Sequence, residues 1–154
     1  MTVIKQEDLI ESVAAALQFI SYYHPADYIA HLARAYEAEQ SLAAKDAIAQ
    51  ILTNSRMCAE GKRPICQDTG IVNVFLKIGM GVRFEGFKGS VTDAVNEGVR
   101  RAYNFADNKL RASIVADPKF DRRNTTEHDP HVVHTDRVLG DTAVVNVAAK
   151  GGGT

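Results

Sequence analysis

Three shortages narrow what this chain can be: cysteine is scarce, charge is nearly balanced and long apolar runs are missing. Two cysteines in 154 residues, with a start that lacks the basic and apolar segments of a secretory signal, indicate a reducing, cytoplasmic setting. Apolar runs of only a few residues exclude a membrane-spanning helix. A net charge of −1 gives no general attraction for nucleic acid or for an acidic membrane surface.

The composition is that of a folded domain. Hydrophobic residues make up 45% and charged residues 24% of the chain, with no internal repeat and no low-complexity segment. The length suits one domain or part of a larger one, and we expect a single domain over residues 1–154. The sequence stops at Gly-Gly-Gly-Thr (151–154), which predicts a chain truncated within a glycine-rich loop.

Helical periodicity dominates the first sixty residues. Apolar residues recur at helical spacing from Gln6 to Ile20, from Tyr28 to Tyr36 and from Leu42 to Cys58. Pro25 is expected at the first position of the second helix, and Ser41 is a favourable N-cap for the third. Three N-terminal helices are therefore predicted. Gly61 is expected to close the last of them as the residue beyond its final turn.

The pattern changes to strands after residue 70. Val72, Val74, Leu76 and Ile78 alternate with more polar positions, which predicts a half-buried strand, and Gly79-Met80-Gly81 predicts a turn. Ser90-Val91-Thr92-Asp93 is a capping box that starts a helix expected to end near Lys109-Leu110-Arg111.

The last forty residues predict a polar loop and two further strands. The loop runs from Asp117-Pro118 to Pro130, and the β-type runs are His131 to Val138 and Thr142 to Ala149. Leu139-Gly140-Asp141 between these runs is a hairpin signal. The fold class is α+β, with N-terminal helices leading to a small mixed or antiparallel sheet packed against helices.

A tight turn connects the helical part of the chain to the strands. It reads Arg-Pro-Ile-Cys-Gln-Asp-Thr-Gly (63–70), and Pro64 and Gly70 favour a turn. Cys66 can ligate a metal or act as a nucleophile, and Asp68 can move a proton or orient a partner. The alternative is a surface loop around a packed thiol, in which Asp68 and Thr69 only hydrogen-bond their own turn.

This turn has two companions downstream, Asn108-Lys109-Leu110-Arg111 and Ala-Ala-Lys-Gly-Gly-Gly-Thr (148–154). In this order and spacing the three motifs resemble the N-terminal (alpha) region of class I fumarases. These are the iron–sulfur hydro-lyases of the fumarate/tartrate dehydratase family. The resemblance covers nearly the whole chain. It implies a fumarate hydratase that interconverts fumarate and malate with a [4Fe–4S] cluster as Lewis acid.

The resemblance also implies roles for single residues. Cys66 matches one of three cysteines that hold the cluster, Gln67 contacts the substrate, and Asp68 binds substrate and takes part in proton transfer. Arg111 grips a substrate carboxylate, a task suited to a planar guanidinium. The family version of this motif is Asn-Leu-Arg, so one residue is inserted here. Gly153 lies against the substrate, unless residues 151–154 are a frayed end.

Other candidate ligands are given structural roles. Cys58 lies on the apolar face of the third helix, matches no family motif and is predicted to be core. On a strand, His131 faces the side opposite to His128 and His134, so the three do not converge on a zinc ion. The segment with these histidines departs from the family pattern.

The number of cysteines limits whether this chain alone can bind a cluster and be active. A cluster with three cysteine ligands needs more than Cys66, so the remainder of the enzyme or a partner chain would carry the others. We expect this chain alone to bind no cluster and to be inactive. The resemblance implies a homodimer and a small dicarboxylate substrate, with fumarate and tartrate both open. The alternatives are a stand-alone module that binds small anions without metal, and a non-catalytic subunit.

Overall fold

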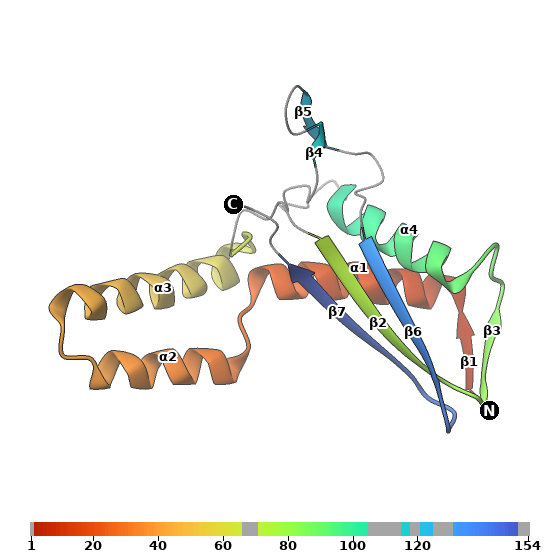
Figure 1. The fold of residues 1–154 in the computed structure, drawn as a ribbon, viewed down its shortest axis with the longest axis horizontal. Helices are drawn as coiled ribbons and strands as arrows, with labels where there is room; N and C mark the ends of the chain where they lie inside the picture. Colours follow the sequence, from red (N-terminus) through yellow and green to blue (C-terminus); the bar gives the residue numbers. More distant parts are fainter. Residues whose placement is uncertain (1, 66–70, 105–114, 118–120, 125–130, 151–154) are drawn as a thin grey trace. The chain divides into compact units, whose positions relative to one another are not determined.

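The structure, a computed structural model, describes residues 2–65, 71–104, 115–117, 121–124 and 131–150. Its elements are shown in Figure 1 and confirm the α+β class. In chain order they are β1 (Thr2–Lys5), α1 (Gln6–Tyr22), α2 (Ala26–Ala38), α3 (Leu42–Gly61), β2 (Ile71–Gly79), β3 (Val82–Glu85), α4 (Val91–Asn104), β4 (Val115–Asp117), β5 (Asp121–Asn124), β6 (His131–Val138) and β7 (Ala143–Lys150). The chain forms two compact units, residues 1–18 with 68–154, and residues 19–67.

The first unit is built on a three-stranded mixed sheet in the order β6-β2-β7. Strand β2 pairs in parallel with β6 and antiparallel with β7, so it is the central strand. Strands β1 and β3 form a separate parallel pair, and β4 with β5 a short antiparallel pair. Strand β5 and the last residue of β4 lie within the stretch predicted as loop, where the polar residues gave no strand signal.

The predicted hairpin between β6 and β7 is wrong, because β2 lies between them. The link that follows β6 crosses the end of β2 instead. There Gly79 N–H donates to Thr142 O at 2.8 Å and Gly81 N–H donates to Gly140 O at 2.8 Å. A Cβ atom on Gly79 would meet Gly140 O at 2.5 Å, so the crossing needs glycine. The apolar alternation of β2 explains its central place, because that position buries one whole face of the strand.

The predicted alternation in β2 is confirmed by burial. Its inner face supplies four buried side chains, Val72, Val74, Leu76 and Ile78. Strand β3 adds Val82 to this core, and helices α1 and α4, labelled in Figure 1, add further buried side chains. Their buried residues are Leu9, Ile10, Val13, Leu17, Ala94, Val95, Gly98, Val99, Ala102 and Tyr103. Each fully buried aliphatic side chain stabilises the fold by about 2 kcal/mol before entropic costs.

Helix α4 begins and packs for reasons that can be read in its sequence. The capping box is confirmed: Ser90 N–H and Oγ–H donate to Asp93 Oδ2, and Asp93 N–H donates to Ser90 Oγ. These bonds, the backbone one first, hold the pKa of Asp93 below its ordinary value. A Cβ on Gly98 would lie 2.8 Å from Ile10 O, so glycine lets α4 approach α1 closely. The predicted helix end at residues 109–111 lies outside the described residues.

The second unit is less buried than its sequence pattern predicts. Ser41 caps α3 as expected, accepting a hydrogen bond from Ala44 N–H at 3.5 Å. Leu42 and Ile51, predicted on the buried side of α3, are 85% and 42% exposed, and α2 has no buried residue. Two helices give each other only one shared seam, so a stripe wider than that seam stays in solvent.

The end of α3 differs from the prediction by one residue. Gly61 is the last helical residue, and Lys62 takes the left-handed conformation with φ 46° and ψ 54°. Arg63 N–H then donates to Cys58 O at 3.0 Å, a bond that spans five residues and reverses the chain. Glycine is the usual residue at such a position, and a lysine there carries steric strain.

Candidate functional site at one end of the central sheet

Two of the sequence motifs flank adjacent strands. Strand β2 begins at Ile71, directly after Gly70, and β7 ends at Lys150, directly before Gly151. Ile71 pairs with Lys150 in the antiparallel ladder. The start of β2 and the end of β7 therefore lie at the same end of the sheet, on neighbouring strands (Figure 1).

Chain length limits how far the motif residues can lie from this end. An extended chain spans at most about 3.5 Å per residue. Asp68 is three residues before Ile71, and Gly153 is three residues after Lys150. A segment of three residues therefore spans at most about 11 Å. The ladder thus pairs the residue that follows Gly70 with the residue that precedes Gly151, although the two are far apart in the sequence.

Two further segments reach the same end. Strand β6 is parallel to β2 and begins at His131, which pairs with Val72. Helix α4 starts at Val91, beside Ile78 at the other end of β2, and Figure 1 shows it running toward the start of β6. The end of α4 and the start of β6 therefore lie toward the end of the sheet at which β2 begins.

The predicted site residues themselves, Cys66, Gln67, Asp68, Arg111 and Gly153, lie outside the described residues. The same holds for Thr69, Gly70, His128, Asn108–Leu110 and residues 151–152. Their roles stay predictions. What the structure contributes is the arrangement of the strands and helices that carry them.

The candidate metal ligands that the structure describes have other roles or neighbours. Cys58 is 4% exposed and is a free thiol, as predicted for a core residue. His134 is exposed on β6, opposite Phe75 of β2, and the two rings stack with centroids 4.8 Å apart. Within the described ranges, no three histidine, cysteine, aspartate or glutamate side chains gather as they would around a metal ion.

Two arginines near the end of α4 are already paired with carboxylates. Arg100 and Arg101 both donate to Glu97, and Arg101 also donates to Glu7 on α1. The bond from Arg100 is the main cause that lowers the pKa of Glu97 to about 2, and Arg101 adds to it. Glu7 and Glu97 raise the pKa of Arg101. These two cations are therefore engaged within the chain itself.

No sequence pattern predicted a group of contacts that lies just before Cys66. Ile65 N–H donates to Ser21 O at 2.9 Å, and Asn54 Nδ2 donates to Ile65 O at 3.4 Å. Cys58 Sγ lies 3.6 Å from Pro64 O. Asn54 belongs to no motif, and its only hint was its place one turn before Cys58.

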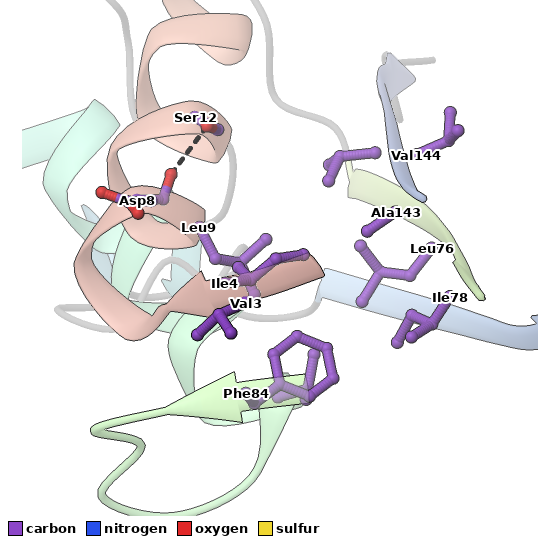
Figure 2. A pocket seen from close by; sticks show the side chains of 12 residues that line it. Val3, Ile4, Asp8, Leu9, Ser12, Leu76, Ile78, Phe84, Ala143 and Val144 are labelled. Carbon is purple, nitrogen blue, oxygen red and sulfur yellow. Dashed lines mark hydrogen bonds between the residues drawn. The ribbon is translucent and has the colours of Figure 1, made fainter. Parts of the chain in front are cut away.

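An apolar cavity of about 230 Å³ lies at the opposite end of the sheet (Figure 2). Its walls come from β1, α1, β3, β2 and β7, including Val3, Leu9, Ile78, Phe84 and Val144. The polar contact drawn there is local to α1, from Ser12 Oγ to Asp8 O. Ile78 and Ala143 mark this end, whereas Ile71 and Lys150 mark the other, so the cavity is separate from the motifs.

Comparison with known proteins identifies the family to which this chain belongs. The chain matches the family model described as fumarate hydratase (Fumerase) over residues 10–154. The chain belongs to this family, and the resemblance stated from the motifs is confirmed.

Curated relatives refine this picture. The L(+)-tartrate dehydratase subunit alpha of Escherichia coli O157:H7 is 30% identical over 145 residues, which is 94% of this chain and 47% of that protein. The same values hold for strain UTI89. A Methanocaldococcus jannaschii protein, provisionally named L(+)-tartrate dehydratase subunit alpha, is 35% identical over 80 residues, 52% of this chain and 28% of its own length. The chain thus spans at most about half the length of these relatives.

No described helix combines the length and the apolarity that a bilayer crossing needs.

Proposed function

We propose that this chain is the N-terminal part of a hydro-lyase that interconverts fumarate and malate. The observation that supports the proposal is the pairing of Ile71, directly after the cysteine motif, with Lys150, directly before Gly151. Membership of the fumarate hydratase family supports the reaction class.

The chain's two thiols are compatible with one cysteine ligand of an iron–sulfur cluster. Thiolates are the usual ligands of such clusters. Cys58 is buried with its sulfur directed at Pro64 O and Asn54 Oδ1, which leaves Cys66 as the ligand. When bound, the cluster supplies a Lewis-acid iron for the hydroxyl and a carboxylate of the substrate.

The remaining motif residues bind and orient the dicarboxylate. The Arg111 guanidinium holds one carboxylate in a bidentate pair, and the Gln67 amide hydrogen-bonds the substrate. Asp68 assists proton transfer at the carbon that gains or loses hydrogen. Without side chains, Gly151 to Gly153 allow the backbone to approach the substrate and to offer N–H donors.

A second polypeptide segment completes the site in this proposal. The chain spans 47% of the E. coli relatives, and their name, subunit alpha, supports the existence of a partner chain. The missing cluster thiolates would come from the remainder of the enzyme or from this partner. We further propose that the completed enzyme is a dimer of such assemblies.

L(+)-Tartrate is the second candidate substrate, favoured by the names of the relatives. It differs from malate by one hydroxyl, so the same carboxylate-binding groups serve both. The discriminating experiment measures fumarate hydration and L(+)-tartrate dehydration by the completed, anaerobically reconstituted enzyme. A higher kcat/KM for fumarate supports the first candidate, and a higher value for tartrate supports the second.

A metal-free binding module is the competing class of function. Calorimetric titration with fumarate, malate, tartrate and phosphate separates the two classes. The hydro-lyase proposal expects dicarboxylate binding by the completed enzyme to weaken after iron removal and in Cys66→Ser. Binding that is unaffected by both changes would contradict it and favour the module.

A further inference from the structure

The peptide that leads into Cys66 is held by two helices. Ile65 N–H donates to Ser21 O, near the end of α1, and Ile65 O accepts from Asn54 Nδ2 of α3. Pro64 O lies within hydrogen-bond distance of the thiol of Cys58, also on α3. Consecutive polar groups of the backbone are therefore fixed from both sides.

Asn54 and Cys58 act as a pair. They are four residues apart on α3, so their side chains lie on one face, one turn from each other. Cys58 Sγ is 3.7 Å from Asn54 Oδ1, which leaves the amide nitrogen of Asn54 directed to Ile65 O. Cys58 is 4% exposed, so water competes little for its weak S–H donor.

The planarity of the peptide bond lets the hydrogen bonds of Ile65 restrict the residue that follows it. A carbonyl oxygen, the following amide nitrogen and the following Cα atom lie in one plane. Holding Ile65 N–H and Ile65 O therefore restricts the direction in which the chain continues. The residue that follows is the one predicted to be a cluster ligand.

We propose that Asn54 and Cys58 are positioning residues that set the direction in which the chain presents the Cys66 thiolate. Cys58 is then a support for the cluster ligand and is itself no ligand. The inference rests on the proposed function, since it concerns a thiolate that binds iron.

The test uses the completed enzyme with Asn54→Ala, Cys58→Ala and Cys58→Ser. Loss of an outer partner of a metal ligand typically lowers metal affinity or activity by about tenfold or more. We expect Asn54→Ala and Cys58→Ala to lose the cluster to a chelator about tenfold faster and to shift the EPR spectrum of the reduced cluster. Cys58→Ser keeps a donor and should largely restore both properties.

Gln50→Ala is the matched control. Gln50 is an amide one turn before Asn54, but it bonds Asp46 Oδ2 at 2.8 Å and none of the backbone of residues 64–65. This variant should keep the wild-type spectrum and rate of cluster loss. A stability change shared by all variants shows in the melting temperature, which a purely structural role would move without moving the spectrum.

A metal-free measurement checks the same point. In the apo-enzyme, alkylation of Cys66 by iodoacetamide, followed by mass spectrometry, should be about fivefold faster in Asn54→Ala, the factor of one ordinary hydrogen bond. Unchanged spectra, cluster loss and alkylation in Asn54→Ala and Cys58→Ala would overturn the inference. Loss of the cluster in Cys58→Ser would overturn it too, by making Cys58 a ligand. Retention of the cluster in Cys66→Ser would instead overturn the proposed function, and this inference with it.

Discussion

The two ends of the β6-β2-β7 sheet are both rich in glycine, yet their glycines have different settings. At the crossing end, Gly79 and Gly81 bond the link after β6, and a Cβ on Gly79 would meet backbone oxygen at 2.5 Å. At the motif end, Gly70 and Gly151 flank the paired residues Ile71 and Lys150. Close packing against the backbone explains the glycines at the crossing end. The glycines at the motif end belong to the motifs that resemble the family.

On the proposed function, one end of the sheet serves folding and the other end serves the chemistry. Residues at the crossing end should affect stability, and residues at the motif end should affect catalysis in the completed enzyme. A substitution at either end that changed both stability and catalysis would contradict this difference.

The largest effect is expected at the motif end. In the completed enzyme, Cys66→Ser removes a thiolate from the proposed cluster site, and with it several kcal/mol of Lewis-acid stabilisation. The hydration rate should fall by about a thousandfold, equal to about 4 kcal/mol. Steady-state assays and iron content measure this loss. An unchanged rate with full iron content would contradict it, and Cys58→Ser is the control thiol substitution.

The next effect is on folding at the crossing end. Gly79→Ala places a Cβ against Gly140 O and Thr142 O, and it should destabilise the protein by about 3 kcal/mol. Gly61→Ala is the matched control, because the nearest atoms that its Cβ would meet belong to the flexible Arg63 side chain, at 3.4 Å. That change should stabilise α3 by up to about 1 kcal/mol. Urea unfolding measures both, and equal effects would contradict the packing argument.

A smaller effect concerns the ion pairs of α4 with α1. The folded-state pKa of Glu97 is about 2, below its ordinary value of 4.5. A lowered carboxylate pKa stabilises the fold fully above about pH 4.5, and the gain disappears as pH falls toward 2. Because the pairs are partly exposed, Glu97→Gln should cost only about 1 kcal/mol at pH 7.

Unfolding of wild type and Glu97→Gln at pH 7, 4 and 2.5 checks the sign. The difference between the two proteins should shrink as the pH falls. A difference that grows toward low pH would show that the carboxylate is not held in its charged form.

The smallest effect is a gain. Lys62 has a positive φ of 46°, which costs a residue with a side chain about 1 kcal/mol relative to glycine. Lys62→Gly should therefore raise stability by somewhat less, because glycine also loses more chain entropy on folding. Thermal unfolding measures the change. A loss of stability would indicate that the Lys62 side chain makes a contact that offsets its strain.

Local patterns predicted the elements well and their arrangement less well. The alternation in β2 and the capping box at Ser90–Asp93 depend on neighbouring residues, so they could be read directly. The order β6-β2-β7 depends on which strand buries most area, and Leu139-Gly140-Asp141 fits a crossing as well as a hairpin. The exposed α2 and α3 stripe shows that helical spacing predicts a face but not what covers it.

The candidate site was predicted from motifs rather than from shape. The motifs named Cys66 and Gly153, and the structure adds the pairing of Ile71 with Lys150, the strand residues next to Gly70 and Gly151. Asn54 and Ser21 could not be predicted, because an isolated asparagine and a backbone carbonyl leave no pattern in a sequence.

Iron-edge anomalous diffraction from crystals of the completed enzyme, grown anaerobically with fumarate or malate, tests the central claim most directly. The account predicts an iron peak bonded to Sγ of Cys66, with the dicarboxylate against residues 67–68 and 151–153. Iron bound to Cys58, or Cys66 without iron beside an occupied cluster, would contradict it.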